Sequence, residues 1–120
     1  MKDIIFQMAE KCDDGILYVD ADGSIRYWNR GCEMIFGFSA DEVTGNNLDV
    51  IIPEKHRKRH WDGFYRVLET GQTAYNGKML KVPALRKDGA KLIIEFSMQI
   101  IELNGKNAGF TAVIRDVTTK

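Results

Sequence analysis

The sequence has little cysteine. It contains two, Cys12 and Cys32, with no metal-type spacing between them. Two such residues cannot build the disulfide framework of a small secreted domain, so we expect reduced thiols and a cytoplasmic location. An excess of charge of one sign is also missing, because 17 basic residues offset 17 acidic ones. A balanced chain lacks the electropositive surface that recognises phosphates, so we expect no direct nucleic-acid partner.

Long apolar runs are missing as well, and no stretch approaches the roughly 20 residues that a membrane-spanning helix needs. The first residues also lack a signal-peptide pattern, so we expect no direct contact with a membrane. What the chain does have is 44% hydrophobic residues in a length of 120. That is enough for one globular domain with a substantial core, and too little for two.

Residues 1–12 place Ile4, Ile5, Met8 and Cys12 at helical spacing, which predicts an amphipathic helix flanking the domain. A helix this short is unstable alone, so it must pack on its own sheet or on a second subunit. We therefore expect the domain proper to cover residues 13–120, and a homodimer to form through the N-terminal helix and the sheet.

Residues 53–70 have the start, the stop and the periodicity of a single longer helix. A proline suits its first turn, and a glycine directly after it supplies a stop. Steps of three or four residues place His60, Phe64 and Val67 on its apolar face. An imidazole there is either a structural histidine bonded to a carbonyl or a ligand, held neutral and aimed into a pocket.

Capping residues predict two shorter helices earlier in the chain. Asn29 can cap the first, which Gly37 ends, and Ser39 with Glu42 forms a capping box for the second. Five segments are predicted strands: residues 15–20, 25–29, 74–86, 91–101 and 108–117.

The segment at residues 74–86 reads as an irregular or edge strand, because Pro83 cannot donate to a central ladder. The other strand segments alternate apolar and polar residues or pair across tight turns. The order of elements predicts the α+β class, with a five-stranded antiparallel sheet and with short helices and one longer helix covering one face.

Motifs along nearly the whole chain resemble those of the PAS domain, or S-box, the sensor module of bacterial signal-transduction proteins. They are Asp20–Asn29 (DADGSIRYWN), Ile35–Ser39 (IFGFS), Glu42–Gly45 (EVTG), Ile52–Glu54 (IPE), Arg86–Gly89 (RKDG) and Arg115–Thr118 (RDVT). The resemblance implies a PAS fold whose cup, between the inner sheet face and the helices, binds a small-molecule ligand.

The same resemblance implies that Asp116, Val117 and Thr118 relay the signal into a linker toward an output domain in cis. The module itself would be non-catalytic. The parent protein would be a two-component kinase, a cyclase, a phosphodiesterase or a transcription regulator.

The longer helix is similar to that of one subgroup, the haem-binding PAS oxygen sensors of nitrogen-fixation histidine kinases. The matching residues are Pro53, Glu54, Arg57, Arg59 and His60. This resemblance implies that His60 is the proximal ligand of the iron in haem b and that Arg66 pairs with a propionate. Leu80 departs from the subgroup, because it stands where these sensors have a distal arginine. Trp61, directly after the histidine, departs as well.

The predicted ligand- or cofactor-binding residues are those that would surround the cup: His60, Phe64, Arg66, Val67, Leu80, Phe96 and Met98. A flavin is not expected, because Leu48 occupies the place of the reactive cysteine in light-sensing PAS domains. His56 and His60 are spaced like a metal pair, but no further ligand completes a shell, so the only metal considered is haem iron.

Three functions remain open. The first is a module that binds a small organic ligand, or none, and works by dimerisation and signal relay. The second is a haem-binding sensor of gas or redox state. A stand-alone enzyme is the third, and it is disfavoured because no nucleophile has a visible base beside it.

Overall fold

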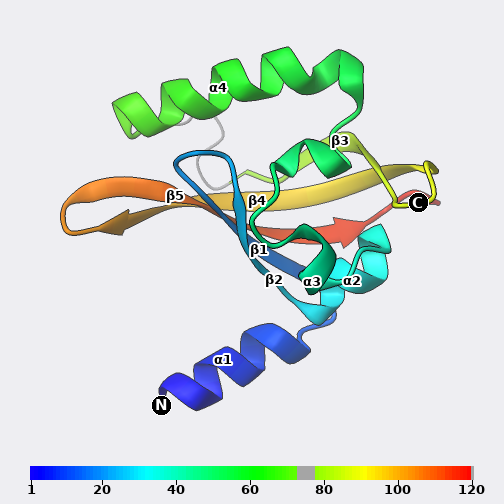
Figure 1. Ribbon diagram of the computed structural model, residues 1–120, viewed down its shortest axis with the longest axis horizontal. Helices are drawn as coiled ribbons and strands as arrows, with labels where there is room; N and C mark the ends of the chain where they lie inside the picture. Colours follow the sequence, from blue (N-terminus) through cyan, green and yellow to red (C-terminus); the bar gives the residue numbers. More distant parts are fainter. Residues whose placement is uncertain (73–77, 120) are drawn as a thin grey trace.

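A five-stranded antiparallel sheet in the order β2-β1-β5-β4-β3 forms the centre of the molecule. The computed structural model describes residues 1–72 and 78–119. The strands are β1 Gly15–Asp20, β2 Ile25–Trp28, β3 Leu80–Leu85, β4 Lys91–Leu103 and β5 Lys106–Asp116. In the view of Figure 1, helix α4 lies above the sheet and helix α1 below it. The predicted α+β architecture is confirmed.

The helices are short apart from the first and the last. They are α1 Lys2–Lys11, α2 Arg30–Phe36, α3 Ala40–Val43, the 3-10 turns η1 Leu48–Ile51 and η2 Glu54–His56, and α4 Arg57–Thr70. Among residues 1–72 and 78–119, none is long and apolar enough to cross a membrane.

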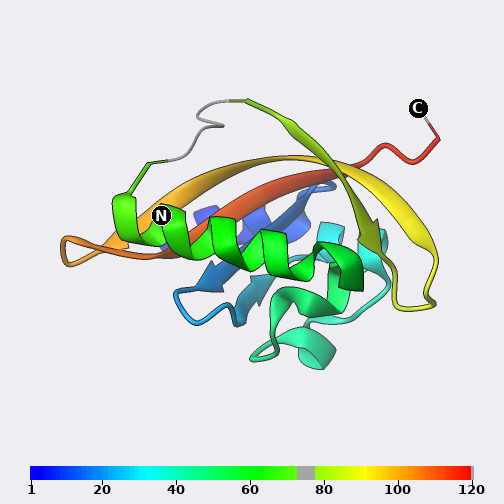
Figure 2. The same ribbon diagram turned by 90° about the horizontal axis from the view of Figure 1, so that it is seen from above.

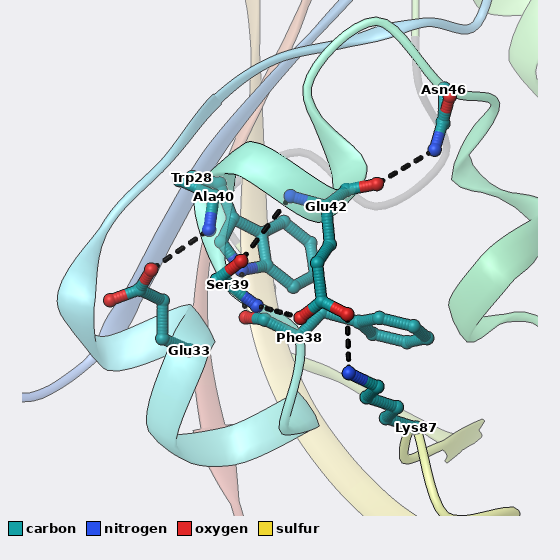
Figure 3. Close-up of polar contacts among 8 residues, drawn as sticks. All are labelled: Trp28, Glu33, Phe38, Ser39, Ala40, Glu42, Asn46 and Lys87. Carbon is teal, nitrogen blue, oxygen red and sulfur yellow. Dashed lines mark hydrogen bonds and ion pairs between the residues drawn. The ribbon is translucent and has the colours of Figure 1, made fainter.

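The predicted caps are confirmed by their hydrogen bonds. The Asn29 side chain accepts from the Cys32 amide at the start of α2, and Gly37 ends that helix in the left-handed conformation. At α3 the capping box is complete, because the Glu42 amide donates to Ser39 Oγ at 3.3 Å and the Ser39 amide donates to Glu42 Oε1 at 2.8 Å (Figure 3). The Glu42 carboxylate also pairs with Lys87 from the β3–β4 turn. These contacts fix the corner between α2 and the sheet.

The prediction of one helix over residues 53–70 is wrong at its start. Residues 54–56 form a separate 3-10 turn, in which the His56 amide donates to the Pro53 carbonyl at 2.9 Å. His56 then has ψ near −4°, which departs from α-helical geometry, so the α-helix begins only at Arg57. The predicted stop is confirmed, since Gly71 ends α4 with a positive φ of 71°.

The long strands bury one face, as their alternation predicts. Leu92 and Ile94 of β4 and Phe110 and Ile114 of β5 are at most 5% exposed. Their neighbours along the strands, such as Val113, face away from this core and are exposed. The two strands pair over most of their length, so the inner sheet face is one continuous apolar surface.

The edge strand is also confirmed. β3 pairs with β4 alone and contains Pro83 opposite Ile93, an edge position where the missing amide proton costs no central ladder bond. The prediction began this segment at residue 74, and residues 74–77 lie outside the described part of the chain.

Candidate functional site

The candidate site lies on the inner sheet face, where the strand register brings three of the predicted residues together. Leu80 of β3 stands directly opposite Phe96 of β4. Met98 follows on the same face of β4, opposite Ala112 of β5. Phe96 and Met98 pack against the core, and all three side chains are only partly buried. The inner face therefore offers apolar surface that the rest of the described chain does not fully cover.

Helix α4 supplies the facing wall. Phe64 is 8% exposed, and its ring centroid lies 4.9 Å from that of Phe110 on β5. Val67 packs against the same core one turn later. Figure 2 shows α4 running across the sheet, over the long strands. The predicted face of the helix is thus the one that meets the sheet.

His60 lies on the same helix in a largely apolar environment. Its ring centroid is 4.5 Å from that of Trp61 and 6.1 Å from that of Phe64. Burial lowers the pKa of His60 below its ordinary value, and the negative charge of Asp49 opposes that shift. The Nδ1 atom is buried and has no hydrogen-bond partner among the residues that the structure describes. The imidazole is therefore held neutral, with an unused polar atom.

Arg66 differs from the other predicted residues. Its side chain is exposed on α4, and no ion pair joins it to any residue in ranges 1–72 and 78–119. The structure places Arg66 on the same helix as His60 but not in the apolar set beneath that helix.

The residues predicted to relay a signal stand where β5 ends. The Val117 amide donates to the Ile93 carbonyl at 2.9 Å, and the Ile93 amide donates to Thr118 Oγ1 at 3.1 Å. Asp116 Oδ1 accepts from the Thr118 amide at 3.0 Å and from its hydroxyl. The segment leaves the sheet through an Asx-type turn while it is still attached to β4.

Sequence reasoning missed how Asn29 and Tyr27 hold α1. Asn29 was recognised only as a helix cap, but its Nδ2 atom also donates to the Ala9 carbonyl at 2.7 Å. The Tyr27 hydroxyl donates to Glu10 Oε2 at 2.8 Å. An asparagine at the end of the predicted strand 25–29 was the available signal, since a buried amide needs both donors and acceptors around it.

The family model described as PAS domain matches residues 13–119. The chain belongs to the PAS domain family. PAS domains are in general non-catalytic sensory modules.

Two curated relatives of this PAS domain are named as sensors. The chain is 26% identical to the oxygen sensor protein DosP of Escherichia coli, over 98% of the chain and 14% of DosP. It is 29% identical to the sensor protein FixL of Bradyrhizobium diazoefficiens, over 88% of the chain and 21% of FixL. The chain therefore spans about a fifth or less of the length of these relatives.

A solved structure confirms the PAS fold. The PAS domain of a protein from Colwellia psychrerythraea superposes with a TM-score of 0.83, at 20% identity, and covers 99% of this chain and 98% of the other.

The burial of His60 makes the stability of this PAS domain depend on pH. Because the pKa of the folded imidazole lies below the ordinary 6.5, the unfolded chain takes up this proton first as the pH falls. We expect His60 to lower stability progressively below pH 6.5. Urea unfolding of wild type and His60→Leu across this range should show the wild type losing stability relative to the variant. If the difference in unfolding free energy between wild type and His60→Leu stays constant with pH, the expectation is contradicted.

Proposed function

We propose that this PAS domain is a sensory module that binds a small, mainly apolar molecule between α4 and the inner sheet face. The observation that carries the proposal is the incomplete burial of Phe96, Met98 and Leu80 on that face of the sheet. A ligand in contact with these side chains would remove their apolar surface from water, at about 25 cal/mol for each Å².

The relay of the signal is part of the same proposal. Asp116, Val117 and Thr118 would pass a change in the sheet to an output domain in cis, because they leave β5 while still bonded to β4 through Ile93. The much greater length of the sensor relatives supports such a domain.

Small apolar probes test the ligand site. Titration of the isotopically labelled chain with indole and naphthalene should shift the amide resonances of β3, β4 and α4, with dissociation constants of about 1 mM or below. Met98→Trp should abolish these shifts, because the larger side chain fills the space. Met34→Trp is the matched control, since Met34 is 73% exposed on α2. Absence of shifts on the inner face with all probes would refute the proposed site.

We also propose a homodimer through α1. Ile4, Ile5 and Met8 of this helix are 56%, 57% and 68% exposed, so the chain itself leaves their apolar stripe uncovered. A second copy supplies an identical stripe, and two-fold symmetry lets each α1 cover the other.

Charge placed in this stripe should weaken self-association. The double variant Ile4→Glu, Met8→Glu should raise the dimer dissociation constant at least about tenfold, because burying one such side chain contributes ~1.5 kcal/mol or more. Sedimentation equilibrium measures the change. Gln7→Glu is the control, because Gln7 lies outside the stripe and bonds Lys11. A wild-type chain that stays monomeric at high concentration would refute the dimer.

A second candidate function is haem binding, and His60 is the observation that favours it. A neutral imidazole in apolar surroundings, with one nitrogen unused, fits the chemistry of an axial iron ligand. Haem bound there would supply an iron that responds to a gas or to redox state. Phe64 and Val67 would pack against its apolar surface, and Arg66 is the cation on the same helix available to a propionate.

The visible spectrum separates the two candidates. If haem is the ligand, the chain purified after haem supplementation should show a strong Soret band that is lost or shifted in His60→Ala. Met34→Ala would serve as a control, because Met34 is 73% exposed on α2. A reconstituted wild type without a Soret band would exclude this candidate and leave the apolar-ligand proposal standing.

A further inference from the structure

We propose that Trp61 couples α4 to the β1–β2 hairpin and, through that hairpin, to α1. This inference rests on the proposed function, in which α4 is one wall of the ligand site. It assigns a positioning role to Trp61, which directly follows His60 and which the resemblance to haem sensors does not explain.

The first contact is between the Trp61 indole and the turn of the hairpin. A Cβ atom built on Gly23 would lie 2.7 Å from both Cη2 and Cζ3 of the indole. The ring therefore rests directly on the glycine backbone, with no room for a side chain between them. Gly23 also has a φ of +84°, so the tight turn and the close approach of the ring both favour glycine.

The second contact fixes the orientation of the ring. Trp61 Nε1 donates to Asp49 Oδ1 at 2.7 Å. Asp49 belongs to η1, and the adjacent Leu48 amide donates to the Gly23 carbonyl at 3.1 Å. Arg57, one turn before Trp61, donates from Nη2 to the Asp49 carbonyl at 3.2 Å. The N-terminal half of α4, η1 and the hairpin turn thus form one connected cluster.

The same hairpin also contacts α1. β2 follows the Gly23 turn directly. The Tyr27 hydroxyl of β2 donates to Glu10, and Asn29, the residue after β2, donates to the Ala9 carbonyl. The ring centroids of Phe6 and Tyr27 also lie 6.2 Å apart, edge to face. A chain of direct contacts therefore runs from α4 through Trp61 and β2 to α1, which lies on the other side of the sheet in Figure 1.

This arrangement would allow ligand binding beside α4 to affect α1, the helix of the proposed dimer. Trp61 is part of α4, so it must move with any change in the height of that helix over β5. The turn at Gly23 then either follows the ring or loses contact with it. Either outcome alters β2 and the residue that follows it, Asn29. Because Tyr27 of β2 and Asn29 both bond α1, we expect α1 to respond to changes at the site beside α4.

Amide hydrogen exchange in the ligand-free chain tests the coupling. Gly23→Ala should displace the indole. Gly89→Ala is the matched control, because Gly89 has a similar φ of +87° but nothing within 4 Å of a built Cβ. Relative to that control, Gly23→Ala should speed exchange about tenfold in both α4 and α1, which corresponds to ~1.4 kcal/mol of local opening free energy. Trp61→Phe keeps an aromatic ring but loses the hydrogen bond to Asp49. It should therefore also speed amide exchange in both helices, by a smaller factor.

Faster exchange in both helices for both variants supports the coupling. Faster exchange in α4 with α1 unchanged would overturn it, as would rates equal to those of Gly89→Ala throughout. These outcomes are independent of probe binding: shifts on the inner face in the titration with indole would uphold the ligand site even where the coupling fails.

Discussion

Replacing Asn29 by alanine should lower the free energy of unfolding by about 4 kcal/mol, because each buried polar group left without a partner costs about 1–3 kcal/mol. Asn29 is fully buried. Its Oδ1 atom accepts from the Ile16 amide at 2.8 Å and from the Cys32 amide at 2.9 Å. Its Nδ2 atom donates to the Ala9 and Asp14 carbonyls at 2.7 and 3.0 Å. Alanine removes all four of these hydrogen bonds, and urea denaturation measures the loss.

Asn46→Ala is the control for this experiment. Asn46 is exposed, and its side chain makes one bond, from Nδ2 to the Glu42 carbonyl at 2.8 Å (Figure 3). In the variant, water can bond the Glu42 carbonyl in place of the lost amide. The free energy of unfolding should therefore change by no more than about 0.5 kcal/mol. Equal losses for the two variants would show that Asn29 contributes no more than an ordinary surface residue. The Asn29 variant should also free α1, visible as random-coil resonances for residues 2–11.

Replacing Gly31 by alanine should be about as damaging, with an expected loss of about 3 kcal/mol or more from overpacking. Gly31 is the second residue of α2 and lies against the segment between α1 and β1. A Cβ atom there would come within 2.1 Å of the Asp14 carbonyl oxygen and 2.9 Å of the Asp13 carbonyl oxygen. Both obstacles are backbone atoms, so relief requires α2 to move away from that segment.

Gly63→Ala makes a matched comparison, because Gly63 also lies in a helix. Nothing stands within 4 Å of its built Cβ, so alanine gains helix propensity without a clash and should raise the unfolding free energy by about 0.8 kcal/mol. The two glycine substitutions should therefore have opposite signs in the same urea experiment. A stabilising or neutral Gly31→Ala would contradict the packing that the structure shows.

The strands and caps were predictable because local chemistry alone specifies them. The alternation at Leu92 and Ile94 identifies the buried face of β4 whatever lies beyond it. The Ser39 and Glu42 side chains find their partners within three residues. The resemblance of the motifs to PAS domains added the expectation of a cup between the sheet and the helices, which no local pattern contains. The strand order came only from the structure.

The start of α4 was not predictable to the same degree. Pro53 and Glu54 suit a 3-10 turn as well as an α-helix, and what separates the two is the tertiary contact of the segment. Arg57 donates from Nε to the Ile52 carbonyl and from Nη2 to the Asp49 carbonyl. These bonds hold η1 and the residue after it against the start of the helix. Propensity cannot anticipate such bonds, since they join residues that the local pattern assigns to different elements.

For the candidate site, the sequence by itself determined which residues share a face. The period of a helix groups His60 with Phe64 and Val67, and the period of a strand groups Phe96 with Met98. Only the tertiary structure decided how these faces meet. It placed Phe64 on Phe110, left Arg66 exposed and laid Trp61 on Gly23. The physical reason is that periodicity fixes directions within one element, whereas contacts between elements depend on close packing of the whole chain.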